Sequence, residues 1–300
     1  MGKDVAIVRA PASTANLGSG FDCIGMALNR YLTIEMAYSD YIRIRLSGEG
    51  QDFPRNRSNL IYQAAMEVFR KAGYPESELS IKVETQIPPE RGLGSSAAAI
   101  CGGMMAANRL LGDPFSKEEL FPLAVKLEGH PDNVAASLFW GIVIAVPEGG
   151  KYRCLRIRPP KGMRIVAAIP DFSLSTRRAR EALPDVYSKG DVIHSIGRSA
   201  LLAGALATGD REALACAMDD RIHEPYRSNW IPGFRELKES CRAYGAAGVA
   251  ISGAGPSVIA LTWKDPAPLL AHMENVFRDH QVPVRLLELG IDLEGTAVLR

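Results

Sequence analysis

The chain has 300 residues, of which 47% are hydrophobic and 23% are charged, and its formal net charge is +1. This composition is that of a globular protein with a sizeable core, long enough for one large domain or two of ordinary size. Thirty-five basic residues stand against thirty-four acidic ones without a basic run, which argues against a nucleic-acid-binding function.

Apolar runs and cysteines indicate a cytoplasmic protein. The longest apolar run, between Asn133 and Pro147, is shorter than the roughly 20 residues that span a bilayer, and the first residues lack the apolar segment of a signal peptide. The five cysteines are scattered, odd in number and without a CxxC pair, which favours buried free thiols over disulfides or a zinc site. We therefore expect no membrane association.

Strands and one helix are predicted at the start of the chain. Apolar residues alternate in three segments, 5–13, 31–39 and 41–48, as is typical of strands. Residues 59–73 have helical spacing and end on a glycine, which predicts a helix. Residues 79–87 alternate again and predict an amphipathic strand.

The middle of the chain predicts two further helices and a boundary. The glycine- and serine-rich segment 88–98 leads into a helix that we expect to end near Leu111. Ser116 and Glu119 have the spacing of a capping box, which indicates the start of another helix. Turn residues cluster around a short strand within 147–162, where we expect the domain boundary.

The second half repeats this mixture of elements. We expect a strand at 163–170, helices within 190–220 and 233–245, and two strands joined by a glycine-rich turn at 248–262. Because strands and helices do not alternate strictly, the predicted fold class is α+β in two domains.

The segment PPERGLGSSAA (88–98) carries the first sign of function. Free backbone N–H groups at a helix start, with the helix dipole behind them, bind anions. The segment lacks the lysine of the common nucleotide loop. Gly92 to Ala97 fit the dinucleotide fingerprint GxGxxA, but the strand before them contains charged residues and ends in two prolines. A simple turn that caps the helix stays open as an alternative.

Further motifs give the segment a context: APASTANLGSGFDCIGMAL (10–28), LEGHPDNVAAS (127–137), FSLSTRRAR (172–180), RIHEPYR (221–227) and ISGAGPSVIAL (251–261). In this order and at these separations they resemble the superfamily of galactokinases, homoserine kinases, mevalonate kinases and phosphomevalonate kinases, and within it the homoserine kinase family. The resemblance implies ATP-dependent phosphorylation of the γ-hydroxyl of L-homoserine in threonine biosynthesis.

The same resemblance implies an architecture. An N-terminal nucleotide-binding domain similar to ribosomal protein S5 would span residues 1–155, and a ferredoxin-like domain would span 156–300. The active site would lie in the cleft between them, and the protein would be a homodimer.

The resemblance also implies the ATP site and its magnesium ion. Magnesium prefers hard oxygen ligands and keeps several waters, so that two protein ligands, Ser96 and Glu128, suffice. The expected ATP-binding residues are Asn59, Pro88, Pro89, Glu90, Arg91, Gly92, Leu93, Gly94, Ser95, Ser96, Ala97, Ala98, Gly253 and Gly255.

A zwitterionic substrate needs groups of both charges. Arginine binds a carboxylate through two parallel hydrogen bonds, and Asp22 is a candidate acceptor for the ammonium group. The expected substrate-binding residues are Asn16, Asp22, His130, Asn133, Thr176, Arg180 and Arg227, and the expected catalytic residues are Asn133, Arg180 and Glu128. Asp132 invites assignment as a general base, but by the same resemblance we expect it to be structural, with the γ-phosphate receiving the proton.

The chain departs from the family pattern in two places. Ser19 replaces a proline, which should loosen that turn slightly, and Glu90-Arg91 stand where small residues are more common. We expect Glu90 to point away from the triphosphate and Arg91 to be exposed or near phosphate. A mevalonate-type kinase and an inactive ligand-binding relative remain alternative functions.

Overall fold

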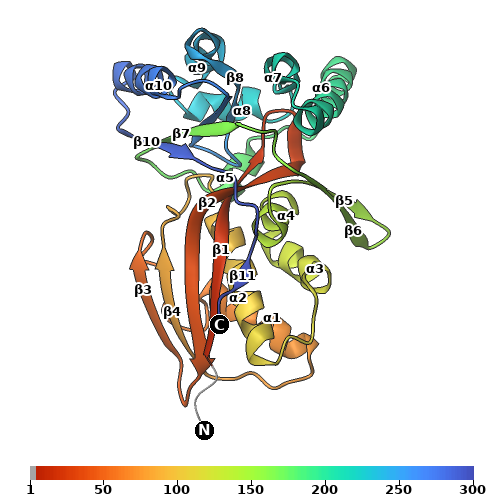
Figure 1. Ribbon diagram of the computed structural model, residues 1–300, viewed down its shortest axis with the longest axis vertical. Coiled ribbons are helices and arrows are strands. Elements are labelled where there is room, and N and C mark those ends of the chain that lie inside the picture. Colours follow the sequence, from red (N-terminus) through yellow and green to blue (C-terminus); the bar gives the residue numbers. More distant parts are fainter. Residues whose placement is uncertain (1–4) are drawn as a thin grey trace.

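The first two strands, β1 (Val5–Asn16) and β2 (Gly20–Tyr38), form a long antiparallel pair in the computed structural model, which describes residues 5–300 (Figure 1). Residues 1–4 of the predicted N-terminal domain lie outside this description. The alternating apolar side chains of β1 are buried on one face, which confirms the first predicted strand.

A mixed sheet grows from this pair. Within residues 5–300 it has seven strands, in the order β11-β1-β2-β4-β3, with β5 paired to β2 and β6 paired to β5. The additional strands are β3 (Arg43–Gly48), β4 (Leu79–Thr85), β5 (Ile142–Glu148), β6 (Lys151–Ile157) and β11 (Ala297–Val298).

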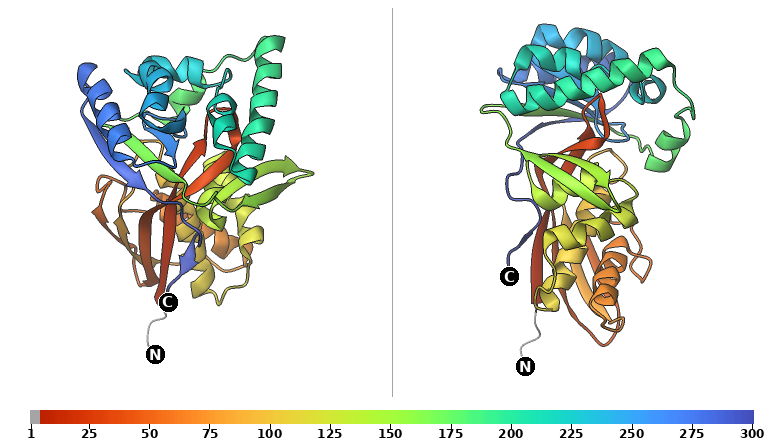
Figure 2. Two further views of the ribbon diagram at one scale, coloured as in Figure 1. Left: turned by 45° about the horizontal axis from the view of Figure 1, so that its top comes forward. Right: turned by 90° about the vertical axis from the view of Figure 1, so that its right-hand side faces the viewer.

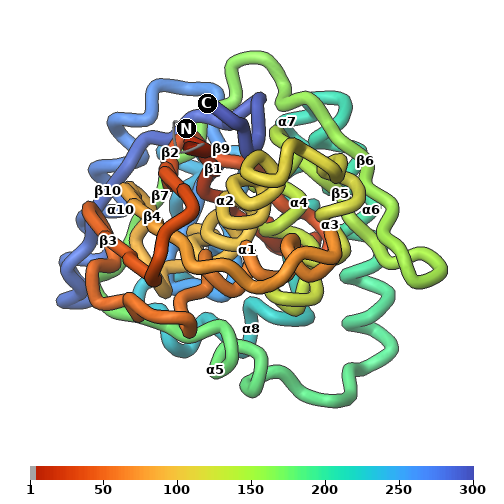
Figure 3. Tube along the Cα trace, turned by 90° about the horizontal axis from the view of Figure 1, so that it is seen from below, coloured from red at the N-terminus to blue at the C-terminus, as the bar shows by residue number. Residues whose placement is uncertain are grey.

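Four helices cover one face of this sheet (Figure 2). They are α1 (Leu60–Lys71), α2 (Ser95–Leu110), α3 (Lys117–Glu128) and α4 (Asp132–Phe139). Seen from below, α2 lies between α1 and the strands (Figure 3). The predicted helix over 59–73 is confirmed, with Asn59 as its N-cap, and so is the capping box of Ser116 and Glu119.

A second, antiparallel sheet has the order β10-β7-β9-β8. Its strands are β7 (Arg164–Pro170), β8 (Ala246–Ile251), β9 (Val258–Thr262) and β10 (Val284–Leu289). Two helices, α9 (Phe234–Ser240) and α10 (Ala267–Asp279), pack on it around a separate apolar core. The predicted strands at 163–170 and 248–262 are confirmed.

Six further elements lie between β7 and β8 in the chain. They are α5 (Thr176–Glu181), α6 (Lys189–Thr208), α7 (Arg211–Ala217), α8 (Glu224–Arg227), and the 3-10 turns η1 (Ser228–Trp230) and η2 (Cys241–Tyr244). None of the helices within residues 5–300 combines the length and hydrophobicity of a membrane span. All five cysteines are free as expected, but only Cys101 and Cys241 are buried, so the expectation of buried thiols is wrong for the other three.

The architecture is the predicted two-domain α+β fold. The predicted division between residues 155 and 156 falls within β6, and it remains a prediction. The short strand β11 comes from the end of the chain but pairs with β1, so that the second half of the sequence completes the first sheet.

Candidate active site

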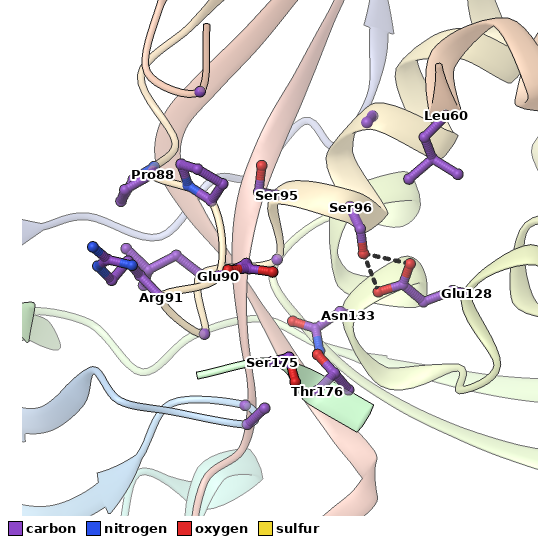
Figure 4. A pocket seen from close by; sticks show the side chains of 18 of the residues that line it. Leu60, Pro88, Glu90, Arg91, Ser95, Ser96, Glu128, Asn133, Ser175 and Thr176 are labelled. Atoms are coloured by element: carbon purple, nitrogen blue, oxygen red, sulfur yellow. Dashed lines mark hydrogen bonds between the residues drawn. The ribbon is translucent and has the colours of Figure 1, made fainter. Parts of the chain in front are cut away.

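A cavity of about 390 Å³ lies where the two domains meet, and residues of both domains line it (Figure 4). The predicted site residues that line it are Asn16, Asp22, Asn59, the whole run from Pro88 to Ser96, Glu128, His130, Asn133, Thr176, Arg180, Arg227 and Gly253. Ala97, Ala98 and Gly255 do not. Ala97 and Ala98 follow Ser96 in α2 and are buried in the core, and Gly255 packs near Gly92.

The helix α2 begins on a backbone that only glycine adopts readily. Gly92 and Gly94 have φ angles of 74° and 67°, and a Cβ on Gly94 would lie 2.0 Å from Ser13 Oγ. Gly94 is the N-cap, no side chain caps the helix, and its first turn has no acidic residue. The first N–H groups of this 16-residue helix are therefore available to an anion in the cavity.

The second glycine turn lies directly against the first, as expected. Ser252 Oγ donates to the carbonyl oxygen of Gly92 at 2.6 Å, and a Cβ on Gly92 would lie 2.1 Å from the carbonyl oxygen of Ser252. The N–H of Gly253 donates to the carbonyl oxygen of Ala15 at 3.0 Å. Backbone contacts thus join the two domains at the cavity, and side chains at these positions would separate them.

Ser96 and Glu128 place two kinds of hard oxygen beside this helix start. Ser96 Oγ lies 2.6 and 2.5 Å from the two carboxylate oxygens of Glu128 (Figure 4). Glu128 is largely buried at the end of α3, and burial raises the pKa of its carboxyl group. Its nearest cationic group is His130, whose Nε2 is 3.8 Å away and which is charged only when protonated.

This donor set fits a magnesium ion that is also bound by phosphate. Within residues 5–300 no group of three His, Cys, Asp or Glu side chains is arranged to hold a metal. A hydroxyl and one buried carboxylate are few ligands for a structural metal site, but they suit magnesium, which takes its remaining ligands from water and substrate phosphates.

His130 and Asp132 form a buried pair beside Glu128. His130 Nδ1 lies 2.7 Å from Asp132 Oδ1, which also accepts from the backbone N–H of Asn133 at 2.7 Å. Burial lowers the pKa of His130, but the hydrogen bond and the charge of Asp132 outweigh it and leave the pKa raised. Asn133 Oδ1 accepts from Ser13 Oγ at 2.9 Å, which turns the Asn133 amide and fixes its position.

On the opposite side of the cavity, Arg180 binds Asp22 in a bidentate ion pair. Arg180 Nη2 and Nη1 lie 2.6 and 2.9 Å from the two Asp22 carboxylate oxygens. Asp22 has a φ of 55°, and Asn16 Oδ1 accepts from its N–H at 3.0 Å. Both charged side chains are partly exposed to the cavity, so that a ligand carrying both charges can exchange with the pair.

Arg227 is a buried cation whose hydrogen-bond partners are two carbonyl oxygens and a histidine. It is 2% exposed, and among residues 5–300 no carboxylate lies within ion-pair distance of it. Its guanidinium donates to the carbonyl oxygens of Ala179 and Gly253 and to His223 Nδ1. Burial lowers its pKa to about 10. Since a buried charge is costly unless it is paired, this residue indicates an anionic ligand.

The two departures from the family pattern have structural roles. Ser19 Oγ donates to the carbonyl oxygen of Ala217 at 2.6 Å, which ties the turn to the end of α7. Arg91 is half-buried, 3.7 Å from Asp171 of the second domain. Glu90 is exposed and lines the cavity, and its expected orientation away from the triphosphate stays a prediction (Figure 4).

The sequence interpretation missed an apolar wall of the cavity. Its members come from β3, β4, the segment before α1 and the start of α1: Leu46, Phe53, Pro54, Leu60, Ile61 and Val83. Their pattern was that of ordinary strand and helix residues, and only the predicted nucleotide-binding role of Asn59 pointed to this region.

Comparisons with known proteins match both halves of the chain. The family models "GHMP kinases N terminal domain" and "GHMP kinases C terminal" match residues 59–141 and 201–273. The homoserine kinase of Moorella thermoacetica is 44% identical over 255 residues, 85% of this chain and 86% of that protein. That of Deinococcus radiodurans is 39% identical over 294 residues, 97% of this chain and 96% of that protein.

Solved structures are similar over the whole chain. A crystal structure of homoserine kinase from Cytophaga hutchinsonii covers 100% of this chain and 98% of its own, with a TM-score of 0.89 and 29% identity. A mevalonate kinase from L. major, solved with R-mevalonate, has a TM-score of 0.69 at 15% identity, which shows a shared fold only.

Proposed function

Since the chain belongs to the homoserine kinase family of the GHMP kinases, we propose that it transfers the γ-phosphate of ATP to the γ-hydroxyl of L-homoserine. The product would be O-phospho-L-homoserine, in threonine biosynthesis. One observation carries the proposal: the buried cation Arg227 and the ion pair of Arg180 and Asp22 line the same cavity as the uncapped start of α2.

The triphosphate would lie on backbone groups. The first N–H groups of α2 and the glycine turn around Gly253 would cradle the phosphates, while the apolar wall would receive the base. Ser96 and Glu128 would hold magnesium, which when bound neutralises charge on the transferring phosphate. Glu90 is an acid that lines the cavity, so we place it beside the nucleotide but away from phosphate oxygens.

The amino-acid end of the substrate would displace the internal ion pair. Its carboxylate would take the two donors that Arg180 gives to Asp22 and would neutralise Arg227, and its ammonium group would take the freed Asp22 carboxylate. The Asn16 amide is held by Asp22 and the Gly253 carbonyl, so it would act mainly by holding this loop. Thr176 and His130 would border the substrate.

The hydroxyl end would lie near Asn133. Its Oδ1 accepts from Ser13, and its Nδ2 donates to Asp132 at 3.4 Å, which leaves a second N–H for the substrate. Asp132 already accepts from His130 and from the Asn133 backbone. These bonds support a structural role for Asp132, with the proton passing to the transferred phosphate. Catalysis would then rest on approximation, to which Arg180 contributes by holding the homoserine carboxylate, and on charge neutralisation at the site of Ser96 and Glu128.

We also propose that the protein is a cytoplasmic homodimer. Within each chain, the boundary between the two domains would lie between residues 155 and 156. The free cysteines suit a reducing compartment. The outer side of α6 exposes Ile193 and Ile196, which suits contact with another subunit. The proposed division lies within β6 of the first sheet, shortly before the second sheet begins at β7, and β11 returns to the first sheet.

The test is release of ADP by the purified protein with ATP and magnesium over a panel of L-homoserine, mevalonate and galactose. We expect turnover of L-homoserine alone. Turnover of mevalonate without homoserine would assign a mevalonate-type kinase. Binding of ATP without any consumption would assign an inactive relative.

A further inference from the structure

Glu224 is a fully buried carboxylate that lies behind the cavity and does not line it. It is the first residue of α8, one helical turn before Arg227. One carboxylate oxygen accepts from the N–H of Ile251 at 2.9 Å, and the other contacts Lys238 Nζ of α9. Lys238 also donates to the carbonyl oxygen of Met218 at 3.2 Å.

The bond to Ile251 fixes the end of an edge strand. In the order β10-β7-β9-β8, strand β8 has one edge without a strand partner, and Ile251 is its last residue. The Glu224 carboxylate satisfies the N–H on that free edge. Figure 1 shows α8, α9 and β8 close together in the upper part of the molecule. The glycine turn begins at the very next residue.

That turn organises the substrate side of the cavity. The carbonyl oxygen of Gly253, two residues after Ile251, accepts from Asn16 Nδ2 at 2.8 Å and from Arg227 Nη1 at 3.0 Å. A shift of this carbonyl would release both donors at once. Glu224 therefore acts on Arg227 through α8 and also through the turn that Arg227 binds.

The Lys238 side of the pair supports the loop after β1. The carbonyl oxygen of Met218 packs so closely on Gly18 that a Cβ there would lie 2.1 Å from it. His223 Nε2 donates to the carbonyl oxygen of Gly18 at 2.8 Å. Since Arg227 can only donate to His223 Nδ1, this histidine is the neutral Nε2–H tautomer. The loop that carries Asp22 thus rests on the same cluster.

We propose that Glu224 is a positioning residue for homoserine binding: its carboxylate, anchored by Lys238, holds the end of β8 so that Gly253 presents its carbonyl to Asn16 and Arg227. The inference rests on the proposed function and adds to it a residue that does not touch substrate.

Two double variants isolate the bond to Ile251. Glu224→Gln with Lys238→Met and Glu224→Met with Lys238→Met both remove the two charges, but only glutamine can still accept from the Ile251 N–H. We expect the KM for homoserine to be about tenfold higher in the methionine pair than in the glutamine pair, while the KM for ATP differs by less. Equal KM values for homoserine in the two folded proteins would overturn the proposal.

A stability control separates positioning from simple loss of structure. Leu269→Ala removes a fully buried side chain of α10 from the second core, away from the cavity. We expect this variant to lower the melting temperature without raising the KM for homoserine, and a rise equal to that of the methionine pair would overturn positioning. Turnover of homoserine by the wild-type protein is measured first. Absence of that turnover would contradict the proposed function, whereas a difference among the variants tests the role of Glu224 alone. If the methionine pair does not fold, Lys238→Met, which removes the anchor of the Glu224 carboxylate, is compared with Lys238→Arg, which keeps the ion pair. We expect a higher KM for homoserine in Lys238→Met alone, and equal values in the two variants would overturn the proposal.

Discussion

The two sides of the cavity are built from different material. The side formed by the start of α2 and the two glycine turns uses backbone groups, whose positions depend on the absence of side chains at Gly92 and Gly94. The opposite side uses charged side chains, the ion pair of Asp22 and Arg180 and the buried Arg227. A substitution on the charged side removes one group and leaves the others in place. A substitution in the glycine turns displaces several backbone N–H groups together. Damage to the first side should therefore be larger and less selective.

The largest expected effect comes from adding a methyl group to the backbone side. Gly92→Ala places a Cβ 2.1 Å from the Ser252 carbonyl oxygen at a φ of 74°, so the two turns must separate. We expect kcat/KM to fall about 10³-fold. Gly73→Ala is the control, because Gly73 has a φ of 75° but nothing within 4 Å of its Cβ. Near-normal activity of Gly92→Ala would remove the distinction between the two sides.

The metal ligands come next in size. Glu128→Gln keeps the shape of the side chain but removes the negative charge that would bind magnesium. We expect kcat to fall about 10²-fold and the magnesium concentration needed for half-maximal activity to rise. Glu118→Gln, an exposed change in the first turn of the same helix, is the control. A magnesium titration of initial rates measures both. An unchanged magnesium requirement would contradict the assignment of Glu128.

On the side-chain side the effect should be selective. Arg180→Met removes two charge-assisted hydrogen bonds to a carboxylate, so we expect the KM for homoserine to rise about 30-fold with the KM for ATP unchanged. Arg177→Met, whose side chain is exposed in the same helix, should leave both constants unchanged. Equal losses for ATP and homoserine would show that the two sides are not separate.

Asp132 lies between the two sides and tests the mechanism. Asp132→Asn keeps the shape but weakens the bond to His130, and we expect kcat to fall about tenfold. Steady-state rates are compared after circular dichroism shows the fold intact. A loss of about 10⁴-fold would instead assign Asp132 as the general base.

The smallest expected effect is on the pH dependence of the melting temperature, through the buried carboxylate of Glu224 behind the charged side of the cavity. Burial raises the pKa of Glu224 to about 7, against the opposing influence of Lys238. The folded state then holds a proton that the unfolded state releases, so this contribution is complete below about pH 4.5 and is lost as the pH rises through 7. Glu224→Gln should flatten the fall in melting temperature over this window by about 2–4 °C.

The control for that measurement is Glu288→Gln, an exposed carboxylate of β10 that pairs with Arg164. It should leave the slope of melting temperature against pH unchanged. The same slope in Glu224→Gln as in the wild type would show that Glu224 does not hold the extra proton.

Local chemistry predicted much of the fold. The alternation in β1, the N-cap Asn59 and the Ser116 capping box act within a few residues, and each was found where the sequence placed it. The sequence interpretation did not identify α10 or β10. In α10 the buried residues Leu269, Met273, Val276 and Phe277 have amphipathic helical spacing, so this helix was predictable, whereas β10 lacks a regular alternation.

The site was predictable only in part. Arg180 and Asp22 are 158 positions apart, and no rule of spacing brings them together, so their association came from the resemblance. The orientation of Glu90 depends on a positive φ of 52° and on Leu174, whose N–H donates to the Glu90 carbonyl oxygen at 3.2 Å across the domain interface. Such tertiary contacts decide which way a loop side chain faces, and the sequence does not state them.

The return of β11 to β1 has a consequence for the order of assembly. Residues 297–300 bind the strand that begins at Val5, through Ile7 and Val8, so almost the whole length of the described chain must be synthesised before this sheet gains its outer strand. A ribosome carrying a partial chain therefore exposes the open edge of β1. During translation the first sheet would therefore have an unpaired edge at β1. A chaperone that binds unpaired strand edges would bind the nascent chain at this edge.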